Sequence, residues 1–280
     1  MRRVLITILK VFGFYLLWAL LLAPIVMSAV TLGGQDWFND IEWRVFVEIG
    51  GTLAVLAVTV FMALALDKRG LGTLGFGAAQ LPDLLVGAAL GALIFAAPLA
   101  LLLAIGAARI APDLSGFTAN ALAVSLLLCF FNVVTQEVLA RGYIFQELWR
   151  KYGAPLAIGV SSLIFVALHA APVSQGAPGL IAGLNILIAS VMLGLAYVRT
   201  NALWLPIGIH LGWNALQGPV LGINVTGNTI AMGYWRVLEF PGEPLLTGGG
   251  PGVEGGLAGL IGPLLGLAVI LLLYRRKPSG

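Results

Sequence analysis

Three short polar stretches interrupt long apolar segments of this chain, and their residue types could activate a water molecule. They are "TQEVLAR", "FVALH" and "HLGWN". Glu137 and Arg141 are four residues apart, as are His210 and Asn214. In an α-helix this spacing places both side chains on one face. We therefore expect helices that each present a polar stripe to the interior of a bundle.

Hydrolysis of an amide is the reaction that these residue types would serve. Glu137 and His169 could orient a water molecule and take its proton. His210 and Asn214 could donate hydrogen bonds to the oxyanion of a tetrahedral intermediate. Arg141 lies one helical turn from Glu137 and would hold that carboxylate in place. The structural alternative is a buried Glu137–Arg141 ion pair that only stabilises helix packing.

A metal ion is the other way to activate a water molecule. One glutamate and two histidines, here Glu137, His169 and His210, form a known set of catalytic zinc ligands. The local H-E-x-x-H signature is missing from the sequence, so the ligands would come from three separate helices. The sequence leaves open whether a divalent metal such as Zn²⁺ is bound.

The composition places these residues in a lipid bilayer. Of the 280 residues, 60% are hydrophobic and 10% are charged, whereas about a quarter are charged in soluble domains. A membrane-spanning helix needs roughly 20 mainly apolar residues. Lipid cannot hydrogen-bond the backbone, so we expect an all-α transmembrane bundle that forms one domain over residues 1–280. We predict eight spans, at about residues 4–30, 45–66, 83–110, 120–147, 155–170, 179–198, 203–221 and 253–274.

Basic residues predict the orientation of these spans, because Lys and Arg concentrate in short cytoplasmic loops. With eight alternating spans, the basic pairs near the ends of the apolar segments all fall on one side. Both termini are then cytoplasmic in a multi-pass protein, which we expect in a bacterial or archaeal cytoplasmic membrane. The small net charge of +3 favours no nucleic-acid partner.

Glycine spacing and a glycine-rich tract predict two further features. Gly87 and Gly91 are four residues apart, which indicates close packing between helices. Residues 222–252 form the longest predicted connection on the outer side, and it leads into "LLTGGGPGVEGG". This segment is expected to be a flexible outer loop unless something packs on it.

The three polar stretches resemble the motifs of the CPBP intramembrane proteases, the family of type II CAAX prenyl endopeptidases and bacterial Abi-type proteins. "QEVLARGY" is similar to E-E-x-x-x-R-G, "FVALH" to F-x-x-x-H and "HLGWN" to H-x-x-x-N. The resemblance extends over about residues 121–217. It implies a helical bundle of around eight spans, with a catalytic cavity reached from the cytoplasm. It also implies an endopeptidase that acts on a peptide or membrane-protein substrate, with the glutamate and the first histidine on the water and the second histidine and the asparagine on the oxyanion. The family has been described both with and without a metal.

One position departs from the family motif. The first motif glutamate, usually given the water-activating role, corresponds to Gln136, which is neutral and cannot be a general base. Either Glu137 takes over that role, or the chain is an inactive membrane binding or immunity protein. Neighbours on a helix point about 100° apart. Whether Gln136 or Glu137 faces the cavity therefore distinguishes these two hypotheses. A proton-relay transporter that uses the histidines is a third hypothesis. Glu48, near the end of a predicted span, is expected to be solvated or to snorkel.

Overall fold

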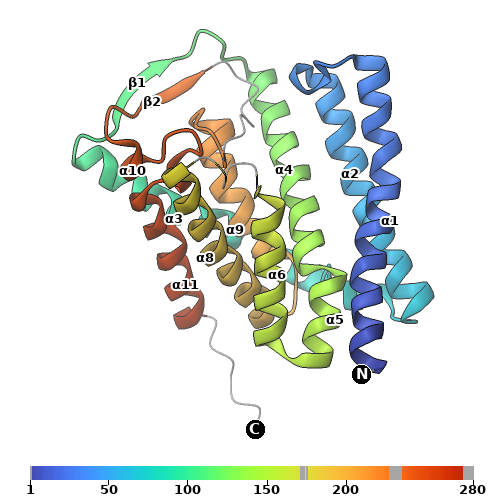
Figure 1. The fold of residues 1–280 in the computed structure, drawn as a ribbon. Coiled ribbons are helices and arrows are strands. Elements are labelled where there is room, and N and C mark those ends of the chain that lie inside the picture. The colour runs from blue at the N-terminus through green and yellow to red at the C-terminus, as the bar shows by residue number, and fades with distance from the viewer. Residues whose placement is uncertain (1, 171–173, 175, 227–234, 274–280) are drawn as a thin grey trace.

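The structure, a computed structural model, describes residues 2–170, 174, 176–226 and 235–273 and is almost entirely helical (Figure 1). Two short strands, β1 and β2, form an antiparallel pair at one end of the bundle. The helices are α1 (Arg2–Gly33), α2 (Ile41–Phe61), α3 (Pro82–Ala104), α4 (Ala119–Arg141), α5 (Tyr143–Tyr152), α6 (Ala154–Leu168), α8 (Gly176–Thr200), α9 (Trp204–Ala215), α10 (Pro244–Thr247) and α11 (Ile261–Leu273), and the strands are β1 (Arg109–Asp113) and β2 (Arg236–Glu239).

Five helical segments are long and apolar enough to cross a membrane, and two shorter apolar helices accompany them. This confirms a multi-span helical membrane protein. The long segments expose their apolar side chains: on α1, Leu5, Leu9 and Phe12 are each more than half exposed. On a helix of this length and hydropathy, such a surface is typical of a lipid-facing side. The five segments are Arg2–Gly33, Ile41–Leu66, Pro82–Ala104, Ala119–Tyr152 and Gly176–Thr200, and the shorter two are Ala154–Leu168 and Leu257–Leu273.

Three of the eight predicted spans are shorter than their apolar patterns indicated. α6 has 15 residues and ends just before His169. α9 has 12 residues and continues into a π-helical turn at Leu216–Val220, which contains Pro219. α11 has 13 residues and is preceded by two 3₁₀ turns. In α9 and α11 the rest of the apolar run forms π-helical or 3₁₀ turns instead of regular α-helix.

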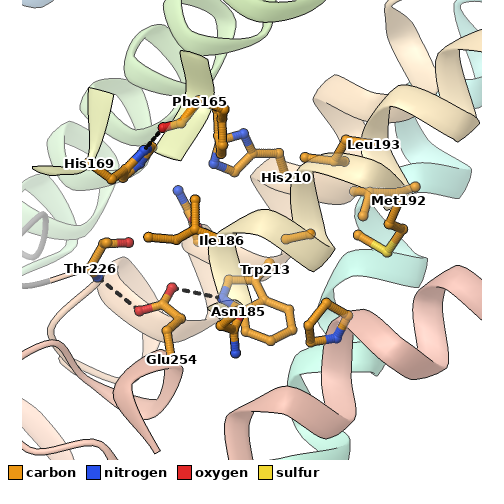
Figure 2. A pocket seen from close by; sticks show the side chains of 14 residues that line it. Phe165, His169, Asn185, Ile186, Met192, Leu193, His210, Trp213, Thr226 and Glu254 are labelled. Carbon is orange, nitrogen blue, oxygen red and sulfur yellow. Dashed lines mark hydrogen bonds between the residues drawn. The ribbon is translucent and has the colours of Figure 1, made fainter. Parts of the chain in front are cut away.

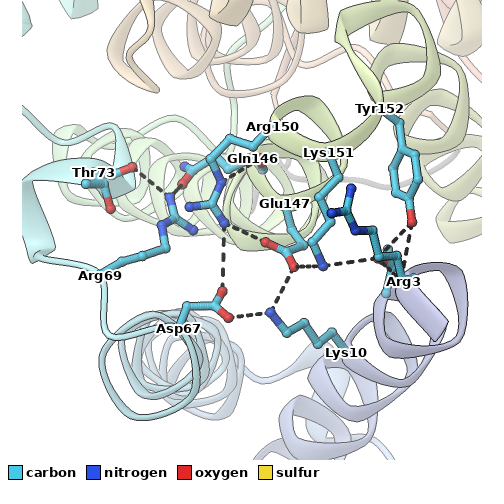
Figure 3. Close-up of polar contacts among 11 residues, drawn as sticks. Arg3, Lys10, Asp67, Arg69, Thr73, Gln146, Glu147, Arg150, Lys151 and Tyr152 are labelled. Atoms are coloured by element: carbon cyan, nitrogen blue, oxygen red, sulfur yellow. Dashed lines mark hydrogen bonds and ion pairs between the residues drawn. The ribbon is translucent and has the colours of Figure 1, made fainter.

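The predicted span 120–147 is broken at Gly142, between α4 and α5. A Cβ atom there would lie 2.3 Å from the carbonyl oxygen of Val138, so only glycine fits. The break turns α5 so that Glu147 pairs with Lys10 of α1 at 2.8 Å and with Lys151 at 2.6 Å (Figure 3). Only 2% of the Glu147 side chain is exposed. This ionic cluster ties α1 to α5.

α3 and α9 approach each other most closely through glycines. A Cβ atom on Gly91 would lie 2.0 Å from the carbonyl oxygen of Ile209, and one on Gly212 would lie 2.0 Å from that of Ala88. The close packing that the Gly87 and Gly91 spacing predicted is therefore confirmed. This contact positions α9, which carries His210 and Asn214.

The outer segment 222–252 has more structure in its described part than the sequence predicted. β2 pairs with β1, with Arg109 opposite Glu239. In the glycine-rich tract, Thr247, Val253 and Glu254 are buried. Something does pack on this tract, because Val253 and Glu254 lie against α8 and α9. The strand pair was not predicted, since neither strand is longer than five residues.

Candidate active site

His169 lies directly after α6, where the helix end fixes its ring. Its Nδ1 is 2.7 Å from the carbonyl oxygen of Phe165, one turn earlier. A carbonyl oxygen only accepts, so Nδ1 carries the hydrogen and Nε2 keeps its lone pair. The imidazole also packs on the Phe165 ring, with the centroids 4.7 Å apart. The F-x-x-x-H spacing therefore sets both the tautomer and the orientation of His169.

A fully buried ion pair lies on α4, behind the second histidine. Arg141 donates from Nη1 to Glu137 Oε1 at 3.0 Å, and both side chains have no exposed surface. Arg141 also donates to the carbonyl oxygen of Ser190 at 3.0 Å, and its guanidinium lies 4.5 Å from the centre of the Phe165 ring. These contacts leave Arg141 one position, and Arg141 in turn holds the Glu137 carboxylate.

His210 receives its orientation from this carboxylate. Its Nδ1 is 2.8 Å from Glu137 Oε1, so Nδ1 donates and Nε2 points away from the ion pair. Asn214 lies one turn further along α9 and is 5% exposed. A hydrogen bond from an imidazole to a carboxylate is charge-assisted, so this contact fixes the ring firmly.

A cavity of about 200 Å³ brings the predicted site residues together. His169, His210, Asn214 and Gln136 all line it. Glu137 is not among its lining residues; in the described part of the chain, its carboxylate accepts hydrogen bonds from Arg141 and His210. The structure thus answers the question of orientation: the glutamine faces the cavity, and the neighbouring glutamate faces the second histidine.

A smaller cavity of about 50 Å³ also borders the two histidines (Figure 2). Its walls are mainly apolar and include Ile186 and Trp213. At its far end the buried Glu254 accepts hydrogen bonds from Trp213 Nε1 at 3.1 Å and from the Thr226 backbone at 2.9 Å. Burial raises the pKa of Glu254 above the ordinary carboxyl value.

Two cavity residues escaped the sequence analysis. Glu48 was expected to be solvated, but it is half-buried on α2, lines the larger cavity and accepts hydrogen bonds from Asn132. Asn132 in turn contacts Gln136. A signal was present, because Asn132 and Gln136 are four residues apart and form a second polar stripe on α4, next to that of Glu137 and Arg141. The partner on α2 could not be found from the stripe alone.

The donor atoms of this site do not fit a catalytic metal. Within the described ranges, no group of three His, Cys, Asp or Glu side chains is arranged to hold a metal ion. Glu137 Oε1 is already bonded to Arg141 and to His210 Nδ1. Two of the three expected ligands therefore face each other rather than a common point. The zinc hypothesis from the sequence finds no support in this geometry.

The larger cavity extends toward one end of the bundle. Its lining includes Phe38, which is exposed in the connection between α1 and α2. Figure 1 shows this connection at the end opposite the start of α1. With a cytoplasmic start of α1, as the basic residues predict, the cavity would open to the other side of the membrane. The family resemblance implies the cytoplasmic side, so the two predictions conflict in this structure.

Comparison with known proteins identifies the segment that carries the site. Residues 118–216 match the family model described as Type II CAAX prenyl endopeptidase Rce1-like. The matched segment contains all three motif stretches, from Gln136 to Asn214. The resemblance to the CPBP family is thereby confirmed over these residues. No curated protein and no solved structure matches the chain.

Proposed function

We propose that this membrane protein, whose residues 118–216 match the CAAX-protease family, is an endopeptidase that cleaves a peptide bond in the larger cavity. The observation that carries the proposal is the convergence of His169, His210 and Asn214 on one cavity of about 200 Å³. The family match supports the reaction class. The polar lining supports a water-filled site, because a cavity of this volume holds several water molecules.

His169 is the general base of the proposed reaction. Its Nδ1 is occupied by the Phe165 carbonyl oxygen, so its Nε2 takes a proton from water while the water oxygen bonds to the substrate carbonyl carbon. The Asn214 amide and His210 Nε2 donate hydrogen bonds to the oxyanion that forms. When the intermediate collapses, His169 returns the proton to the departing amine.

Glu137 has a different role here from the one that the sequence suggested. Its Oε1 accepts from His210 Nδ1 at 2.8 Å and so fixes the ring; the proposed role uses the imidazolium, in which Nε2 also carries a hydrogen. A donor at Nε2 is what an oxyanion requires. Arg141 fixes the carboxylate, as Glu137 fixes the histidine. The motif Glu-x-x-x-Arg thus acts on the oxyanion side of the site rather than on the water.

The smaller cavity suits an apolar substrate side chain beside the scissile bond. It adjoins both histidines and has Phe165, Ile186 and Met192 in its wall. Its volume of about 50 Å³ favours a small aliphatic group.

Cleavage by the reconstituted protein tests this proposal. The purified chain is placed in liposomes with a farnesylated, internally quenched CAAX peptide and, separately, with a mixture of unmodified quenched peptides. We expect His169→Ala, His210→Ala and Asn214→Ala each to lower kcat by about 10²-fold or more. Asn120→Ala, at an exposed position near the start of α4, is the matched control. Wild-type rates in all three site variants would refute the proposal.

A non-catalytic binding protein is the second candidate, because the neutral Gln136 faces the cavity in place of the motif glutamate. It predicts that the liposomes retain a peptide and release it uncleaved. Mass spectrometry of the bound peptide distinguishes this outcome from slow hydrolysis.

A further inference from the structure

A hydrogen-bonded chain of three side chains crosses from α2 to α4 at the wall of the larger cavity. Asn132 Nδ2 lies 3.2 Å from Glu48 Oε1 and 3.4 Å from Glu48 Oε2. Gln136 Nε2 lies 2.7 Å from Asn132 Oδ1. All three residues line the cavity that holds the two histidines. The chain therefore connects a carboxylate on α2 to the glutamine that replaces the motif glutamate.

The carboxylate determines the direction of this chain. An ionised carboxylate only accepts hydrogen bonds, so Asn132 must turn its NH₂ group toward Glu48. The carbonyl oxygen of Asn132 then faces Gln136, which must in turn present its own NH₂ group. Each amide has one orientation that satisfies its neighbour. The Oε1 atom of Gln136 is left over, and it has no hydrogen-bond partner among the residues that the structure describes.

A buried amide oxygen without a protein partner is usually bonded to water. Gln136 lines a cavity large enough for water and shares that cavity with His169. A water molecule that donates one hydrogen to Gln136 Oε1 and the other to His169 Nε2 has its lone pairs directed elsewhere, toward a substrate carbonyl carbon. Glutamine cannot take the proton, but in this arrangement it does not need to.

We propose that Glu48 is a positioning residue of the active site, which acts through Asn132 to hold the Gln136 amide with Oε1 toward the attacking water. The inference rests on the proposed endopeptidase function and deepens it. It gives Gln136 a part in water orientation, and it places the negative charge of the site on α2 instead of at the first motif position. His169 alone removes the proton.

Substitution of Glu48 by glutamine tests the direction of the chain. A neutral amide at position 48 can donate as well as accept, so both neighbouring amides can reverse and turn the NH₂ group of Gln136 into the cavity. We expect Glu48→Gln to lower kcat by about tenfold, since a charge-assisted hydrogen bond no longer enforces one orientation. KM should stay within about twofold, because the chain contacts water rather than substrate.

A second substitution should restore activity by reversing the chain. In Glu48→Gln/Gln136→Glu, the carboxylate at position 136 accepts from Asn132, and Asn132 accepts from position 48. A carboxylate oxygen then faces the water, as in the family motif. We expect kcat of the double variant within about threefold of wild type. A purely structural role of Glu48 predicts no such recovery. Glu42→Gln, at an exposed position in the first turn of α2, is the control.

The outcomes separate this inference from the proposed function. Equal kcat in Glu48→Gln and Glu42→Gln, or no recovery in the double variant, would overturn the role of Glu48. Cleavage by wild type would still uphold the endopeptidase function in that case. If wild type cleaves neither peptide, the proposed function fails. Labelling with ¹⁵N-asparagine in nanodiscs then tests whether Glu48 orients the Asn132 amide. A shift of the Asn132 side-chain signal in Glu48→Gln but not in Glu42→Gln supports the hydrogen-bonded chain as a feature of the binding site. An unshifted signal overturns the chain.

Discussion

Removing the charge of Glu137 should cost the protein much of its stability. Glu137 and Arg141 have no exposed surface and are 3.0 Å apart. In Glu137→Gln, the guanidinium keeps its contacts with Ser190 and Phe165 but loses its only carboxylate partner among the described residues. His210 Nδ1 then faces a neutral amide in place of a carboxylate and loses its charge-assisted hydrogen bond. Breaking a buried pair in this way leaves one uncompensated charge in the interior.

The expected magnitude follows from burial. Removing one member of a buried ion pair typically costs about 3–5 kcal/mol. At about 2–4 °C per kcal/mol for a chain of this size, the apparent melting temperature should fall by about 6–20 °C. The measurement is thermal unfolding in one detergent at one heating rate, because a membrane protein of this kind is compared by its apparent Tm.

The exposed pair between β1 and β2 provides the control. Arg109 and Glu239 are 67% and 40% exposed, and such pairs contribute at most about 1 kcal/mol. Glu239→Gln should therefore shift the melting temperature by no more than about 4 °C. Glu137→Gln/Arg141→Met removes both buried charges and should recover at least half of the loss. The reasoning is refuted if Glu137→Gln is no more destabilising than Glu239→Gln.

Three further perturbations address helix packing, access and buried charge. Gly91→Ala should destabilise the protein by about 1–3 kcal/mol and reduce cleavage, because its Cβ would lie 2.0 Å from a backbone oxygen of α9. Gly159→Ala is the control, because a Cβ there meets nothing within 4 Å. Equal melting temperatures of the two variants would contradict the packing argument. Phe38→Cys, in the connection between α1 and α2, and Leu71→Cys, in the connection between α2 and α3, should react with an impermeant maleimide from opposite sides of the membrane, in a background without the native cysteine. Labelling of both from one side would contradict the placement of these connections at opposite ends of α2. Burial raises the pKa of Glu254, so its charged form is disfavoured in the folded state. The stability of wild type relative to Glu254→Gln should therefore fall as the pH rises above about 4.5. A difference in Tm between the two proteins that stays constant from about pH 4 to 8 would contradict this prediction.

Apolar periodicity made the helical membrane fold predictable. Segments of twenty or more apolar residues can satisfy their backbone in lipid only as helices, and five such helices are present. The breaks were harder to predict. Gly142 resembles any other glycine in an apolar run until the carbonyl oxygen of Val138 is seen beside it. The strand pair and the packed glycine-rich tract likewise depend on partners distant in the sequence.

The motif residues show where local spacing is informative and where it is not. Four-residue spacing correctly placed Arg141 beside Glu137, because a helix brings such positions together whatever surrounds it. The same spacing does not say which side of the helix faces the cavity. Gln136 and Glu137 are adjacent, and only the packing of α9 against α4 places His210 over the glutamate.

The sequence by itself determined a helical membrane protein, the polar residues of its candidate site and the segment that matches the CAAX-protease family. Each of these depends on composition or on contacts within one or two helical turns. Only the tertiary structure decided that Glu137 bonds to His210, that Gln136 faces the cavity and that Glu48 lies at its wall. Those facts join α2, α4 and α9, which lie up to about 160 residues apart in the chain, and no local pattern specifies how separate helices rotate against one another.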